Sequence, residues 1–338
     1  MRWFVCLTAL VMLMAAASGD LGYAQEGAAN GCKEGEVPGK IGEEDTCPTT
    51  FGPLIADTAV PLEHGKFAIQ PYTMFRFTGG LFTPGWRRVK APGNYFAFEL
   101  PVKFTYGLFK HFEIYAVSTY RHNWVSNFSP DFRGPRGEKN ADYGGIRDIN
   151  LTLKYLFLEE TASLPAVAGI FGTDFPTGHY YHLNPGRLGV DQVGYGCYTF
   201  YTGLNASKYV KPFIFYANLW YGVSTRSQYR FEAEDLGTVN NSLHYRDVLY
   251  LRLAAEYPLG GRGPWVALLE YYAEFETGRI FGPKPNSPIP AYAYMGICPG
   301  IEYVYSDRLA FALGVAIDLA GKSTAFEYTP MLSMIHNF

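Results

Sequence analysis

Long apolar runs are almost absent from this sequence. The one that stands out, Trp3 to Ala17, follows Arg2 and precedes the small-residue stretch Gly22-Tyr23-Ala24. This order is typical of a secretory signal peptide, and we expect cleavage after Ala24. The run is shorter than the roughly 18 to 20 residues that a membrane-spanning helix needs. No comparable run follows Ala24, which excludes a membrane protein built from helices.

An excess of charge of one sign is missing as well. The 28 Lys and Arg residues nearly balance the 31 Asp and Glu residues, and the formal net charge is -3. Without a basic excess, nucleic acid is not an expected partner. His179 and His182 offer two nitrogen ligands but have no cysteine or carboxylate cluster beside them, so we expect no metal site. We expect no cofactor either.

Cysteine is scarce, and its few positions permit a disulfide. Of five cysteines, Cys6 lies in the expected signal peptide. The other four are Cys32, Cys47, Cys197 and Cys298, and an even number suits the oxidising periplasm. We expect a local disulfide between Cys32 and Cys47. The alternative ties the N-terminal segment to the rest of the chain through Cys197 and Cys298, which would make that segment a plug.

Aromatic residues, in contrast, are abundant, with 27 Tyr and 25 Phe. Tyrosine suits the headgroup interface of a membrane, because its ring is apolar and its hydroxyl is polar. The mean hydropathy of -0.06 fits a membrane barrel, in which only every second side chain faces lipid. Composition therefore favours a membrane protein that crosses with strands.

Apolar and polar residues alternate along many segments after residue 66. Within 94–106, Phe98 and Leu100 share one face, while Glu99 and Lys103 share the other. A period of two indicates strands. We predict about 12 of them, an even number as a single-chain barrel requires. They lie near 66–79, 94–107, 111–125, 146–158, 165–175, 193–206, 211–224, 244–257, 264–276, 291–305, 308–320 and 325–338.

This pattern predicts an all-β protein, a closed antiparallel transmembrane β-barrel over residues 66–338. Residues 25–65 show little periodicity and are expected to form a periplasmic tail or a plug. The predicted connections alternate between short and long, as in outer-membrane barrels with short periplasmic turns and long outer loops. We therefore expect the outer membrane of a Gram-negative bacterium as the location, with both barrel ends in the periplasm.

Two sequence features suggest partners in that membrane. Phe338 closes the last predicted strand, and a terminal aromatic residue there is a mark that the barrel-assembly machinery recognises. The basic run from Trp86 to Lys90 falls in the first long loop. It could contact anionic lipopolysaccharide at the lipid surface, although a solvated loop end is the simpler interpretation.

Two short stretches carry a family resemblance. Gly144 to Tyr155 contains a G-x-x-D strand motif, and Phe171 to Gly178 ends in P-T-G. Both resemble outer-membrane transporters assigned to the MetA pathway of phenol degradation, and the resemblance covers mainly residues 95–320. It implies a channel-like outer-membrane barrel, linked in some members to the handling of aromatic compounds. It implies no particular substrate for this chain.

The candidate site residues are the charged and tyrosine side chains that the alternation places inside the barrel. They could line an open pore and set its charge preference, or pair across a lumen filled with side chains. The tyrosines could guide an amphipathic or aromatic solute, although filling the lumen is the simpler role. The charged residues are Glu99, Lys103, Glu113, Arg121, Asp148, Lys154, Arg252, Glu256, Glu270, Glu274, Glu302 and Asp318, and the tyrosines are Tyr115, Tyr250 and Tyr272.

These features together predict a channel or transporter-like barrel that passes small solutes, aromatic or hydrophobic compounds among them. An outer-membrane barrel enzyme of the lipase or protease type is the alternative. Such an enzyme needs a nucleophile with a base within hydrogen-bond reach, and the predicted strands show no outward-facing or rim serine with a histidine about two residues away. We expect no enzyme. A structural barrel is the third alternative.

Overall fold

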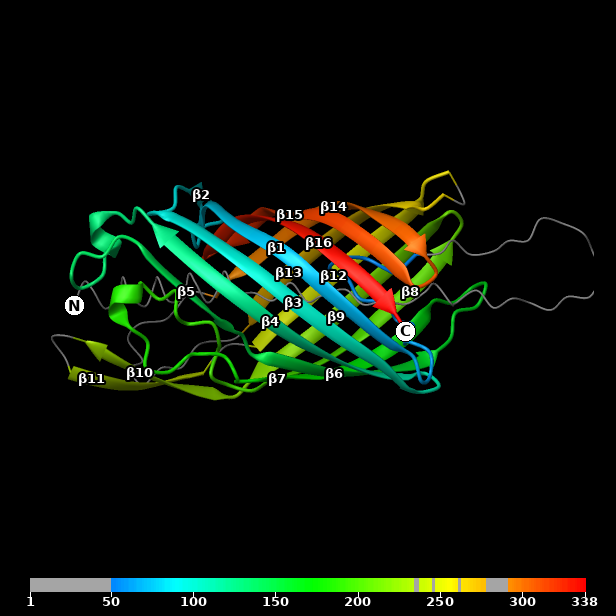
Figure 1. Ribbon diagram of the computed structural model, residues 1–338, viewed down its shortest axis with the longest axis horizontal. Coiled ribbons are helices and arrows are strands. Elements are labelled where there is room, and N and C mark those ends of the chain that lie inside the picture. The colour runs from blue at the N-terminus through cyan, green and yellow to red at the C-terminus, as the bar shows by residue number, and fades with distance from the viewer. Residues whose placement is uncertain (1–49, 234–236, 245–246, 261–262, 278–290) are drawn as a thin grey trace, which may run out of the picture.

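The barrel predicted from the sequence is confirmed by a computed structural model, which describes residues 50–233, 237–244, 247–260, 263–277 and 291–338. Each barrel strand pairs antiparallel with the next, and the last pairs with the first, which closes the sheet (Figure 1). The strands are β1 Phe67–Phe82, β3 Asn94–Phe109, β4 Phe112–Ser126, β6 Ile149–Leu158, β7 Ala166–Phe175, β8 Thr199–Val210, β9 Phe213–Ser224, β12 Asp247–Pro258, β13 Trp265–Thr277, β14 Ala293–Ser306, β15 Leu309–Lys322 and β16 Thr324–Asn337. The expected signal peptide, Cys32 and Cys47 lie outside the described residues.

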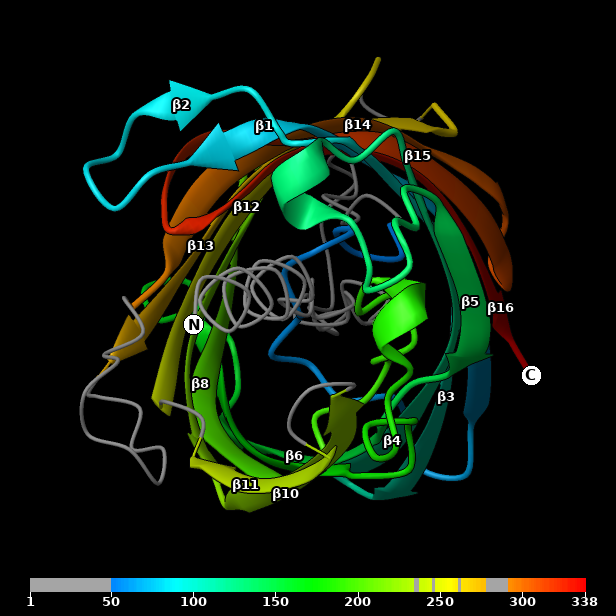
Figure 2. The same cartoon turned by 90° about the vertical axis from the view of Figure 1, so that its left-hand side faces the viewer.

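Shorter elements that the sequence analysis did not predict belong to the long loops. β2 Arg88–Val89 pairs with β1, and β5 Ala141–Ile146 pairs with β4 ahead of β6. β10 Arg226–Ala233 and β11 Gly237–His244 form a separate hairpin. Two 3₁₀ turns, η1 Pro130–Phe132 and η2 Pro185–Arg187, stand at the mouth of the barrel (Figure 2). Short turns and long loops thus lie at opposite ends, as predicted, except that Ser323 alone joins β15 to β16.

Among the described residues, no helix is long and apolar enough to cross a membrane.

One predicted boundary is wrong, because β8 begins at Thr199 and not near residue 193. Residues 193–198 belong to the returning half of a loop that folds inward. Gly196 has a φ of 67°, a left-handed conformation that glycine adopts without strain, and it packs directly against the Tyr180 ring. Cys197 therefore precedes β8, and it is buried by the loop.

The two faces of the wall differ sharply in polarity. On β8, Leu204 is 51% exposed on the outer face, whereas the next residue, Asn205, is 0% exposed inside. Phe171, Leu219 and Leu313 are likewise exposed on the outside. An apolar outer face around a polar interior reverses the pattern of a soluble protein and fits lipid on the outside.

This polarity predicts the effect of a charge placed on the outer face. Leu204→Arg should lower the free energy of unfolding by roughly 2–4 kcal/mol, because Leu204 lies within its strand and would put a guanidinium in hydrocarbon. Tyr198→Arg is the matched control, since Tyr198 is also exposed but lies just outside β8. Urea titration in lipid vesicles measures both. Equal losses for the two variants would contradict an apolar belt around the strands.

Candidate functional site in the barrel lumen

The structure places the predicted inward residues inside the barrel. Asp148 is half-buried in the link between β5 and β6. The others are buried: Glu99, Lys103, Glu113, Arg121, Lys154, Arg252, Glu256, Glu270, Glu274, Glu302, Asp318, Tyr115, Tyr250 and Tyr272. What the sequence could not show is which partners they meet there.

Many of their partners come from residues 50–62, here named the lumen segment. It runs through the interior without regular secondary structure and is buried except at half-buried Val60 (Figure 2). Its wall contacts include Glu113, Ser207 and Glu302, which lie near the short turns of the barrel. The lumen segment therefore occupies the short-turn half of the lumen.

Wall carboxylates satisfy the backbone of the lumen segment. Glu270 accepts hydrogen bonds from the backbone N–H groups of Leu54 at 2.6 Å, Ile55 at 2.9 Å and Ala56 at 2.7 Å. A buried N–H group without a partner is costly, and a bond to a carboxylate is stronger than one to a neutral group. Similar bonds run from Thr50 Oγ1 and Phe51 N to Glu302, and from Leu62 N to Glu113. These acids anchor a chain segment in this structure.

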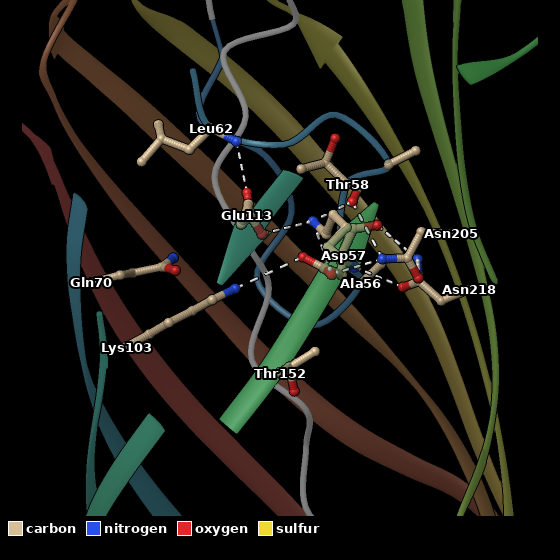
Figure 3. Close-up of polar contacts among 12 residues, drawn as sticks. Ala56, Asp57, Thr58, Leu62, Gln70, Lys103, Glu113, Thr152, Asn205 and Asn218 are labelled. Atoms are coloured by element: carbon tan, nitrogen blue, oxygen red, sulfur yellow. Dashed lines mark hydrogen bonds and ion pairs between the residues drawn. The ribbon is translucent and has the colours of Figure 1, made fainter. Parts of the chain in front are cut away.

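Asp57 is the charged centre of the lumen segment (Figure 3). Its carboxylate lies 3.2 Å from Lys154 Nζ and 3.8 Å from Lys103 Nζ, and accepts a 2.7 Å hydrogen bond from Asn205 Nδ2. The Asn218 amide binds the Asp57 backbone twice, accepting from its N–H and donating to its carbonyl, both at 2.7 Å. Sequence reasoning missed Asp57. Asp57 could have been noticed as an acidic residue in a segment with Pro and Gly, because Lys103 and Lys154 were predicted to face inward and need acidic partners.

A second buried cluster lies around Glu99. Its carboxylate is 3.5 Å from Arg76, 3.2 Å from Arg121 and 3.9 Å from Arg147. Glu327 makes a further ion pair with Arg76 at 3.0 Å. Arg76, Arg147 and Glu327 were not among the predicted site residues, although Arg76 and Glu327 lie on predicted strands. In this layer the inward charges pair with one another along neighbouring strands of the barrel wall.

The tyrosines also have partners in the wall. Tyr272 donates to Asp318 at 2.9 Å, and the Tyr294 hydroxyl donates to Glu274 at 2.6 Å. Lys103 Nζ lies 4.0 Å from the centre of the Tyr115 ring. Because Glu270 and Glu274 are both buried and hydrogen-bonded, the acids of β13 do not form a wet, cation-attracting wall in this structure.

A loop from the long-loop end, residues 176–198, folds over the lumen. Asp148 holds both sides of this loop, accepting the N–H groups of Gly178 and Tyr195 at 2.8 Å each. Leu188 and Val190 at its tip are buried in an apolar cluster with residues of β4. Burial raises the pKa of Asp191, which accepts a hydrogen bond from Asn184 N at 2.8 Å. The loop therefore covers the lumen from the other end.

A cavity of about 70 Å³ lies against the inner wall of the barrel, lined by side chains of β4, β6, β7, β8, β9 and β12. Its lining mixes aromatic and charged groups, among them Tyr201, Trp220, Tyr250, Arg252 and Asp174. Ligand pockets combine apolar walls with a few placed polar groups in this way. The cavity is therefore the candidate binding site of the lumen.

The two cysteines in the described part of the chain, Cys197 and Cys298, are free and buried. The structure therefore does not contain the link through these two residues that would tie the N-terminal segment to the wall. The pairing of Cys32 with Cys47 stays a prediction, because both lie outside the described residues.

Comparison with known proteins identifies the fold. No family model matches the sequence, and no curated protein matches it. The barrel is similar to an outer membrane channel from Pseudomonas putida F1, with a TM-score of 0.65, 11% identity, and coverage of 83% of this chain and 98% of that one. The translocator domain of the autotransporter NalP from Neisseria meningitidis gives a TM-score of 0.48 at 11% identity, covering 80% of this chain and 88% of that one.

The likeness to the Pseudomonas structure shows that the chain has the fold of an outer-membrane β-barrel. The resemblance to the MetA-pathway family stays a prediction, since no family model matches. The expectations of no enzyme activity, no cofactor and no nucleic-acid partner also stay predictions.

Proposed function

We propose that the chain is an outer-membrane channel for small solutes, gated by its own lumen segment. The observation that carries this proposal is a polar, charged lumen inside an apolar barrel, filled by residues that are not part of the sheet. The lumen segment is held by side chains such as Glu270 and Asn218. It can therefore leave without unpairing any barrel strand, and water can take over its hydrogen bonds.

The resemblance to MetA-pathway transporters supports a solute range that includes aromatic compounds, and the structure from Pseudomonas putida F1 with the same fold is described as an outer membrane channel. Displacing the lumen segment would leave Glu113, Glu270 and Glu302 facing water, with Lys103 and Lys154 as nearby cations. Lumen charges of one sign set ion preference. We propose that the open channel favours cations modestly.

The proposed orientation puts the short turns and both barrel ends in the periplasm. Phe338 N donates to Phe67 O at 2.8 Å, so the last residue adjoins the start of the first strand. We propose that the barrel-assembly machinery reads Phe338 at this end. The basic run from Trp86 to Lys90 would then face lipopolysaccharide at the opposite end, with Arg88 exposed and stacked on Phe326.

Weakening one anchor of the lumen segment tests the gate. Glu270→Gln keeps one acceptor oxygen but loses the charge that binds three backbone N–H groups. Bonds to charged groups contribute roughly 1.5–3 kcal/mol, so we expect the open fraction in planar bilayers to rise about tenfold or more. Glu274→Gln is the matched control on the same strand, since Glu274 accepts from the Tyr294 hydroxyl. An equal rise in both variants would contradict gating by the lumen segment.

A further inference from the structure

We propose that the cavity in the middle of the lumen binds a short-chain monocarboxylate through Arg252. The inference deepens the proposed function and rests on it, because it names one solute class that the lumen binds in the closed state, beside the other small solutes that the open channel passes. Binding can nevertheless be measured without conduction. Three observations carry the inference: an unsatisfied guanidinium, acids that are already occupied, and the size of the cavity.

The position of Arg252 follows from the register of β9 and β12. Arg252 pairs with Asn218, and the next inward pair toward the long-loop end is Tyr250 with Trp220. The Arg252 guanidinium carbon lies 4.5 Å from the centre of the Trp220 ring and 5.5 Å from that of Tyr250. The side chain thus lies beside the anchors of the lumen segment, with its head against the aromatic part of the cavity wall.

The Arg252 head has one donor without a partner. The residue is 3% exposed, and its Nη1 is buried without a hydrogen-bond partner among the described residues. A guanidinium stays charged in proteins, and its planar fork of N–H groups matches the two oxygens of a carboxylate. An unpaired buried donor is unfavourable. A carboxylate in the cavity would supply the missing acceptor.

The acids in the cavity lining are already engaged as acceptors. Asp174 accepts from Asn150 Nδ2 at 2.7 Å and from the Tyr201 hydroxyl. Asp148 accepts the two loop N–H groups described above. Arg147, the other cation of the lining, lies 3.9 Å from Glu99. The Arg252 guanidinium can therefore bind a ligand with one negative charge. The carboxylates of Asp148 and Asp174 disfavour a ligand with a second negative charge.

The cavity volume limits the rest of the ligand. At about 70 Å³ it has roughly half the volume of a cavity that holds benzene. A chain of roughly two to four carbons fits this space, and the ring of benzoate does not. Ile170 and Trp220 supply an apolar wall for the chain. Gly203 allows the Trp220 indole to lie close to β8, because a Cβ at that position would meet the indole ring.

Propionate titration of the full-length refolded protein in detergent tests the proposal. We expect saturable binding of sodium propionate by calorimetry and little binding of propionamide, which has the same shape without the charge. Arg252→Gln should weaken propionate binding at least tenfold. Arg252→Lys keeps the charge but loses the fork, so it should weaken binding less. Arg88→Gln is the matched control, since Arg88 also stacks on an aromatic ring but lies in an outer loop, and it should leave binding unchanged.

The outcomes separate the site from the channel. Equal affinity of wild type and Arg252→Gln, or equal affinity for propionate and propionamide, would overturn the site. Tighter binding of benzoate than of propionate would overturn the assigned ligand class. Should Arg252→Gln fail to fold, the weaker binding expected of Arg252→Lys still tests the guanidinium. Propionate binding with a silent bilayer record would support the site and overturn the channel. Conduction without propionate binding would support the channel and overturn the site.

Discussion

A chain that begins at Glu63 should conduct almost continuously in a planar bilayer, whereas the full mature chain should open only briefly. The lumen segment fills the short-turn half of the lumen and is held by Glu113, Glu270 and Glu302. Removing several such bonds at once removes the barrier to water. With each bond to a charged group contributing roughly 1.5–3 kcal/mol, we expect the open fraction to rise by about a hundredfold or more.

The measurement is single-channel recording of both forms after refolding, with heat-dependent gel mobility as the check that each barrel is folded. Arg88→Gln in the full chain serves as the control, because its side chain lies in a long loop away from the lumen segment. A folded chain without residues 50–62 that stays silent would contradict both the gate and the channel.

Glu99→Ala should produce the largest loss of barrel stability. Glu99 is 0% exposed and lies within 4 Å of three guanidinium groups, at 3.5, 3.2 and 3.9 Å. Its removal leaves Arg76, Arg121 and Arg147 close together with less negative charge to balance them. Removing one partner of a buried ion pair typically costs about 3–5 kcal/mol of unfolding free energy.

Glu159→Ala is the control for that substitution. Glu159 pairs at the surface with Lys110, which is highly exposed, and with His111. Surface pairs contribute roughly 0–1 kcal/mol, so this variant should unfold almost as wild type does. Urea titration in vesicles compares the two. A loss below about 1 kcal/mol for Glu99→Ala would mean that water, and not Glu99, compensates the three arginines.

The strands were predictable because lipid imposes one simple rule on every second residue. β3 illustrates this rule, because its residues alternate between the outer and the inner face, as Phe98 and Glu99 do. The rule fails where alternation has another cause. Val193 and Cys197 are buried by an inward-folded loop, and their spacing imitates a strand that begins only at Thr199.

The candidate site was predictable only in part. Alternation places Glu270 inside, but its partners are backbone N–H groups of Leu54 to Ala56, which leave no trace in the side-chain pattern. The donor of Arg252 that lacks a partner depends on the register of β9 and β12, and on which other groups lie near it inside the lumen. The sequence pattern predicts which face of the barrel wall a side chain occupies. It does not predict the hydrogen-bond partner of that side chain, because the partner lies far away in the chain.

A reversible lock on the lumen segment tests the gated channel most directly. Thr58 Oγ1 and Ser207 Oγ lie 3.4 Å apart, so Thr58→Cys with Ser207→Cys can form a disulfide between the lumen segment and β8. Wild type taken through the same oxidation and reduction is the control, because it carries Cys32, Cys47, Cys197 and Cys298 without the new pair. We predict no conductance from the oxidised variant and brief openings after reduction. Equal conductance in the two states would contradict a channel gated by residues 50–62.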